Sequence, residues 1–196
     1  MRFTKMQGIG NDYVYVNCFE EHVENPSELA KQMSRRHYGV GSDGLILICP
    51  SDTADAKMRM FNRDGSEGLM CGNAVRCVGK YLYDVRGVRR GQITVETLAG
   101  VRALDMITRG GIATGARVMM GKAEFAPQNI PVLLTGESVI GRRVTVGGAG
   151  YTVTCVSVGN PHCVVFCNDP DALDLEAVGP EFENSPLFPE RVNTEF

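Results

Sequence analysis

The chain has 196 residues, of which 43% are hydrophobic and 22% are charged, as in an ordinary soluble globular protein. Its formal net charge of −3 provides no basic stripe, so we expect no nucleic acid and no membrane surface as a partner. The start of the chain lacks the apolar run of a signal peptide, and no segment could span a membrane. The seven cysteines are an odd number without a C-x-x-C pair, which favours free thiols in the cytoplasm over disulfides or structural zinc.

The first sixty residues alternate short strands with one helix. Asn25 and Pro26 are typical of a helix start, with Glu28 placed for a capping box. The helix is expected to end at Gly39, with an inner face marked by Leu29, Ala30, Met33 and His37. Short apolar or alternating runs predict strands at Arg2–Met6, Tyr13–Asn17, Leu45–Cys49 and Lys57–Phe61.

Cys71 stands directly before the clearest helical pattern in the chain. Amphipathic spacing and a stop at Gly87 predict a helix whose apolar positions are Val75, Val78, Leu82 and Val85. Cys71 would then lie at or beside the N-cap, where unpaired N–H groups and the helix dipole favour a thiolate that can act as base or nucleophile. The N–H groups of Gly72 and Asn73 could hold a substrate carboxylate. On spacing alone, a buried and unreactive cysteine is an equally good interpretation.

The rest of the chain is predicted to be mainly short strands. Gln92–Thr97 and Val101–Ile107 indicate a hairpin that turns at Ala99–Gly100. A short helix is expected at Asp171–Val178, followed by a loop and the start of a last strand. The other predicted strands are Arg117–Met120, Arg143–Val146, Tyr151–Val158 and Cys163–Cys167.

Two parts of the chain share one plan, which suggests an internal repeat. Met6–Asn17 and Val156–Asn168 both run from a strand through Gly-Asn into a second strand. Asn25–Pro26 is matched by Asp169–Pro170 at the start of the following helix, and Asp43 is matched by Asn193 before the next strand. The first copy then reaches the Cys71 motif, whereas the second copy stops before an equivalent point.

Six motifs together resemble the diaminopimelate epimerase family, and they follow the family's order along the chain: GIGNDYV, GVGSDGLILI, FNRDGSE, MCGNAVRC, GNPHCV and FPERVN. The resemblance implies an α/β fold (an α+β roll) of two lobes, each a sheet around a central helix. It implies an enzyme without metal or cofactor that interconverts LL- and meso-2,6-diaminopimelate, a precursor of lysine and peptidoglycan. The substrate would be a small molecule, and a homodimer is a possible assembly.

The resemblance also implies roles for individual residues. Cys71 would be one of two catalytic cysteines, and His162 would be important for catalysis. The residues that the resemblance assigns to substrate binding are Asn11, Asn62, Gly72, Asn73, Asn160 and Asn193.

The chain departs from the family after FPERVN. The family continues with a Glu-Arg pair and a second cysteine at another helix start, whereas this chain ends at Phe196. We therefore expect a first lobe over residues 1–115, an incomplete second lobe over residues 116–196, and impaired epimerisation. Two alternatives stay open: a remnant that binds substrate without turnover, and a related proline-racemase-like or phenazine-biosynthesis-like isomerase, against which CGN and FPERVN argue.

Overall fold

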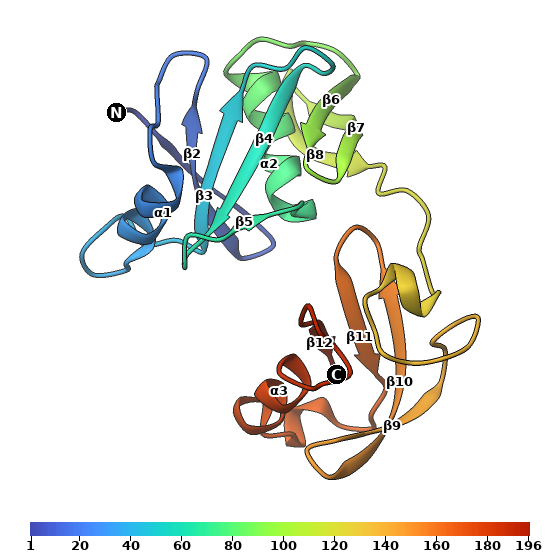
Figure 1. The fold of residues 1–196 in the computed structure, drawn as a ribbon. Helices are drawn as coiled ribbons and strands as arrows, with labels where there is room; N and C mark the ends of the chain where they lie inside the picture. Colours follow the sequence, from blue (N-terminus) through green and yellow to red (C-terminus); the bar gives the residue numbers. More distant parts are fainter. The chain divides into compact units, whose positions relative to one another are not determined.

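The structure is a computed structural model that describes residues 1–196, and the chain divides after Met120 into two units (Figure 1). The first unit contains β1 (Thr4–Gly8), β2 (Asn11–Asn17), α1 (Pro26–Ser34), β3 (Gly44–Cys49), β4 (Ala56–Asn62), β5 (Glu67–Gly68), α2 (Gly72–Asp84), β6 (Gln92–Thr97), β7 (Gly100–Arg109) and β8 (Ile112–Val118). The second unit contains η1 (Pro127–Asn129), β9 (Arg142–Val146), β10 (Ala149–Ser157), β11 (Pro161–Val165), η2 (Pro170–Ala172), α3 (Leu175–Glu183) and β12 (Asn193–Glu195). None of the helices is long and apolar enough to cross a membrane.

The first unit is one curled sheet with a helix on each face. Its strand order is β1-β2-β3-β4-β6-β7-β8, and β5 pairs with β4. The helix α2 contacts β1 and β2 at one end of the sheet and β6, β7 and β8 at the other, so the sheet wraps around it. The helix α1 packs on the outer face, against β3 and β4 (Figure 1).

Alternating side chains along the strands build a separate core on each face of this sheet. In β2, Tyr13 and Tyr15 face α2, whereas Val14 and Val16 face α1. The next strand continues both sets, with Ile46 and Ile48 inside and Leu45 and Leu47 outside. Both faces of β2 and β3 are therefore buried, which explains why their sequences are nearly continuous apolar runs.

The two helices of the first unit end where the loops that follow them supply hydrogen bonds. The predicted stop of α2 at Gly87 is confirmed, because Gly87 has a positive φ of 73°. Val85 is the C-cap of this helix and is 64% exposed, so its assignment to the apolar face of the helix was wrong. In α1, the N–H groups of Gly41 and Ser42 donate to the last carbonyls, at Met33 and Ser34.

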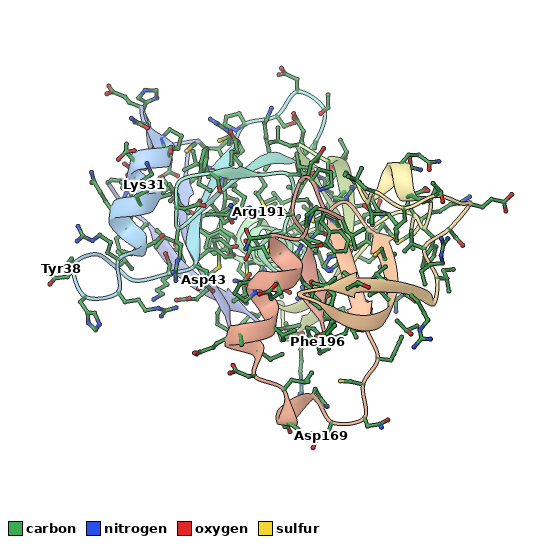
Figure 2. All side chains as sticks on the ribbon, turned by 60° about the horizontal axis from the view of Figure 1, so that its bottom comes forward. Lys31, Tyr38, Asp43, Asp169, Arg191 and Phe196 are labelled. Carbon is green, nitrogen blue, oxygen red and sulfur yellow. The ribbon has the colours of Figure 1, made fainter.

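The helix α1 therefore ends earlier than the sequence predicts. Its C-cap is Arg35, and His37 lies exposed in the loop that follows, so the assignment of His37 to the inner face of the helix was wrong. Tyr38 stands at the tip of the same loop and is 84% exposed (Figure 2).

The segment around Arg117 belongs to the first sheet. The predicted strand Arg117–Met120 is the end of β8, which begins at Ile112 and pairs antiparallel with β7. The pairing extends this sheet past residue 115, and the division between the units lies after Met120.

The second unit is a smaller sheet, in the order β12-β11-β10-β9. Its core lies on the face covered by α3, where Phe182 is fully buried and makes edge-to-face contacts with Tyr151 and Phe196 at 4.9 and 5.3 Å. The predicted helix at Asp171–Val178 is instead two pieces, η2 and α3, because Asp174 caps a new helix by accepting from the Ala177 N–H.

The two units repeat one arrangement of strands and helix. β1 and β2 are antiparallel, α1 follows, and β3 returns parallel to β2. β10 and β11 are likewise antiparallel, α3 follows, and β12 returns parallel to β11. The weak sequence repeat therefore corresponds to a repeated β-β-α-β unit.

Candidate functional site

Cys71 is the N-cap of α2. Its backbone is extended, and its sulfur accepts a hydrogen bond from the Ala74 N–H at 3.5 Å. The sulfur also lies 3.5 Å from Oδ1 of Asn11, and the side chain is partly exposed. The sequence-based placement of Cys71 at a helix start is confirmed.

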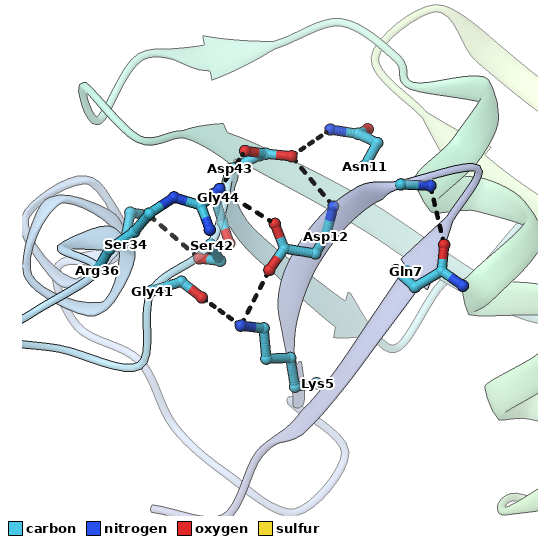
Figure 3. Close-up of polar contacts among 11 residues, drawn as sticks. Lys5, Gln7, Asn11, Asp12, Ser34, Arg36, Gly41, Ser42, Asp43 and Gly44 are labelled. Carbon is cyan, nitrogen blue, oxygen red and sulfur yellow. Dashed lines mark hydrogen bonds and ion pairs between the residues drawn. The ribbon is translucent and has the colours of Figure 1, made fainter.

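Asn11 is held in place by Asp43, a residue that the sequence did not single out for the site. The Asn11 side-chain amide donates to Asp43 Oδ2 at 2.8 Å, and the Asp12 backbone N–H donates to the same oxygen at 3.1 Å (Figure 3). Arg36 lies 3.4 Å from the other Asp43 oxygen. Because the two ends of an amide are fixed together, holding Nδ2 on Asp43 directs Oδ1 toward Cys71.

Tyr13 completes the surroundings of the Cys71 sulfur. It follows Asn11 by two positions on β2, so both side chains lie on one face, and the Cys71 thiol and the Asn11 amide are close enough to shift the pKa of its hydroxyl. Burial raises the pKa of Tyr13, and the negative charge of a Cys71 thiolate raises it further. Tyr13 therefore stays a neutral phenol. In the sequence, the one signal that could have placed Tyr13 in the site is its position two residues after Asn11 on the same strand.

Asn62 lies at the same end of the sheet. Tyr13 and Asn62 are both in register with Gly44 on the strand between them. A Cβ added to Gly44 would lie 2.1 Å from the Phe61 carbonyl oxygen and 2.9 Å from the Tyr13 ring. The Asn62 amide donates to Ser66 Oγ at 3.0 Å, which ties it to the turn that leads to the Cys71 loop.

The first turn of α2 lines a cavity of about 340 Å³. Asn73 accepts a hydrogen bond from Arg76, and a Cβ added to Gly8 would lie 3.0 Å from the Asn73 carbonyl oxygen, so the β1–β2 turn packs closely on the helix start. The cavity is lined by Gly72, Asn73, Arg76, Ala116, Val118 and Met120. A larger cavity, of about 650 Å³, is lined by residues late in β2 and α2, including Asn17 and Val85, and contains none of the predicted site residues.

The second unit groups the remaining predicted residues at one end of its own sheet. His162 and Asn193 are opposite each other on the parallel strands β11 and β12. The His162 Nδ1 atom lies 2.7 Å from Glu195, and the Asn193 amide donates to the Pro161 carbonyl at 3.0 Å. Asn160 lies in the preceding turn, directly before β11.

The repeat gives these positions counterparts in the first unit. Tyr13 pairs with Gly44 as His162 pairs with Asn193, so the structural counterpart of Asn193 is Gly44. The sequence-based match of Asn193 to Asp43 was wrong by one residue, because strand register was not visible in the sequence. Tyr13 is correspondingly the counterpart of His162.

Comparison with known proteins identifies the relatives of this chain. The family model for diaminopimelate epimerase matches residues 3–126. The diaminopimelate epimerase of Acetivibrio thermocellus is 55% identical over 196 residues, and that of Desulfovibrio desulfuricans is 55% identical over 203 residues. Each match covers 100% of this chain and 70% of the relative.

Solved structures show the same fold at low sequence identity. A probable proline racemase from Agrobacterium radiobacter matches with a TM-score of 0.64 and 14% identity, and a hydroxyproline epimerase from Agrobacterium vitis with 0.61 and 12%. Each match covers 93% of this chain and 54% of the other, so the chain spans about half the length of these structures. The sequence matches are far closer, and the chain belongs to the diaminopimelate epimerase family of amino-acid isomerases.

Proposed function

We propose that residues 1–196 carry one acid/base half-site of a diaminopimelate epimerase that interconverts LL- and meso-2,6-diaminopimelate without a cofactor. The observation that carries this proposal is the position of the Cys71 sulfur. It lies at the N-cap of α2, 3.5 Å from both the Ala74 nitrogen and Asn11 Oδ1. A thiol at this position can lose and regain a proton beside donors that could hold a substrate.

The chemistry of epimerisation requires two acid/base groups. The α-proton leaves one face of the carbon and a proton returns to the other, so one group begins as thiolate and its partner as thiol. Fixed dipoles must stabilise the charge that develops next to the carboxylate. The N–H groups of Gly72 and Asn73 would bind that carboxylate, and the neutral amides of Asn11 and Asn62 would bind the rest of the substrate without altering the charge of the thiols.

The roles of the second-unit residues follow from the family resemblance. Asn160 and Asn193 would contact substrate, and His162 would support catalysis. The short contact between His162 and Glu195, at 2.7 Å, fixes the imidazole orientation that such a role requires.

Residues 1–196 offer no second thiol in a setting like that of Cys71. Cys77 is buried within α2, and Cys155 and Cys163 are fully buried in the second sheet. Cys167 is exposed in the loop between β11 and η2, where it caps no helix. Cys18 and Cys49 pack with the outer core of the first sheet, away from α2. We therefore propose that this polypeptide alone epimerises poorly, since a positioned acid or base contributes about 10²–10⁴-fold.

The test incubates the 196-residue protein with each pure stereoisomer in deuterated water and follows α-hydrogen exchange and inversion separately. We expect exchange that depends on Cys71, with inversion slower than exchange. Inversion as fast as exchange would contradict the proposal that these residues carry only one half-site, because such inversion would require a second positioned acid. Binding without exchange would favour the alternative of a substrate-binding remnant.

A second set of substrates addresses the racemase alternative. The structural matches to a proline racemase and a hydroxyproline epimerase show the fold alone, at 14% and 12% identity. We expect no exchange with proline or hydroxyproline, and exchange with either one in preference to diaminopimelate would overturn the proposed substrate. The cytoplasmic location and the homodimer stay predictions from the sequence.

A further inference from the structure

Cys18 and Cys49 lie side by side at the ends of two parallel strands. Asn17 on β2 is opposite Ile48 on β3, and the Cys18 N–H donates to the Ile48 carbonyl at 2.8 Å. One residue further along, Cys18 is opposite Cys49. Neighbouring strands are about 4.8 Å apart, which lies within the Cα separation of about 4.4–6.8 Å that a disulfide needs.

The two side chains are accessible and lie next to each other. Both cysteines are partly exposed, and each thiol is close enough to shift the pKa of the other. They pack at the margin of the outer core with Val23 and Leu29. This core lies between the sheet and α1, on the face opposite α2, so the pair is separate from the Cys71 site.

The pair has unequal thiols. The neighbouring Cys18 thiol is the main cause that lowers the pKa of Cys49, and the Arg59 guanidinium acts in the same direction. The pKa of Cys18 is raised, mainly by the Cys49 thiol and then by burial. The charged groups that face the pair are Lys57 and Arg59 on β4, Glu67 on β5 and Glu21 after β2.

We propose that Cys18 and Cys49 are a reversible dithiol–disulfide pair that reacts with low-molecular-weight disulfides such as oxidised glutathione. The Cys49 thiolate attacks one sulfur of the oxidant, which forms a mixed disulfide and releases one thiolate. Cys18 then loses its proton and attacks the Cys49 sulfur, which releases the second thiol. The protein loses two protons and two electrons, and one oxidant molecule becomes two thiols.

The disulfide would join the ends of β2 and β3. The loop that it closes contains α1 and the segment with Arg36 and Asp43, and closing a loop lowers the entropy of the unfolded chain. The oxidised protein should therefore unfold at a higher denaturant concentration than the reduced protein, with Cys71 still a free thiol.

The experiment treats the folded, reduced 196-residue protein with oxidised glutathione, blocks the remaining thiols, and maps unreduced peptides by mass spectrometry. We expect a cross-link between Cys18 and Cys49 that dithiothreitol reverses. In Cys18→Ser, a glutathione adduct should accumulate at Cys49, because no thiol is present to resolve it. Circular dichroism of this variant checks that it is folded.

The second unit supplies a matched control. Cys155 and Cys163 are also opposite each other, on β10 and β11, but both are 0% exposed. They should stay reduced until the protein is unfolded in denaturant. The proposal is overturned if Cys18 and Cys49 stay reduced in the folded protein, if a stable adduct forms on the wild type without a cross-link, or if Cys155 and Cys163 react equally fast.

Discussion

Replacing Asp43 by alanine tests whether the Cys71 site depends on a neighbour that never touches the sulfur. The Asp43 carboxylate accepts from the Asn11 amide at 2.8 Å and from the Asp12 N–H at 3.1 Å. Both bonds go to the same oxygen, Oδ2, so an asparagine could keep both with its carbonyl oxygen, whereas alanine has no acceptor at this position. Asp43→Ala therefore loses both hydrogen bonds, which leaves the Asn11 amide free to rotate away from Cys71.

The magnitude follows from the two lost hydrogen bonds. A bond to a charged acceptor contributes about 1.5–3 kcal/mol, and the Asp43 side chain is 35% exposed, so solvent screening favours the lower end of that range. We expect Asp43→Ala to lower the free energy of unfolding by about 2–3 kcal/mol. Because a misplacement of 1 Å can cost about 10²-fold in rate, α-hydrogen exchange should fall by roughly 10- to 100-fold.

Asp12→Ala is the matched control. It removes the same charge from the neighbouring position, where the Asp12 carboxylate pairs with Lys5 at 2.9 Å and Arg36 at 3.7 Å. Its backbone N–H still donates to Asp43. The assay measures solvent deuterium entering the α-carbon of diaminopimelate, with urea denaturation of both variants. An equal loss of exchange in both variants would refute the orientation of Asn11 as the cause and indicate a general effect of charge.

Three further outcomes follow from local features. Cys71→Ser should abolish exchange and keep the fold, because serine is a favoured N-cap; a large loss of helicity would contradict this. The hydrogen bond from Lys5 lowers the pKa of Asp12, so stability from this carboxylate is present above about pH 4 and declines as the pH falls further; in urea titrations, Asp12→Asn should show a smaller decline. Ile9 has a φ of 54° in the β1–β2 turn and is 82% exposed, and Ile9→Asn should raise the free energy of unfolding by about 1 kcal/mol, a gain that thermal denaturation would detect.

The sequence alone was sufficient for features that depend on neighbours along the chain. The cap at Cys71, the apolar stripe through Val75, Val78 and Leu82, and the stop at Gly87 are local patterns with a 3.6-residue period. The alternation in the strands is equally local. The motif order was sufficient to identify the family, because each motif is a short run of consecutive residues.

Only the tertiary structure decided which distant residues meet. Asp43 reaches Asn11 because β2 and β3 pair in parallel, and the same pairing brings Cys18 beside Cys49. The early end of α1, which exposes His37, depends on N–H groups from a loop that folds back. Register between strands is set by side-chain packing on both faces of a sheet and by the turns that join them, and a period of two within one strand carries no information about its partner. For that reason the sequence indicated the thiol of the site, whereas the residues that orient it became visible only in the folded chain.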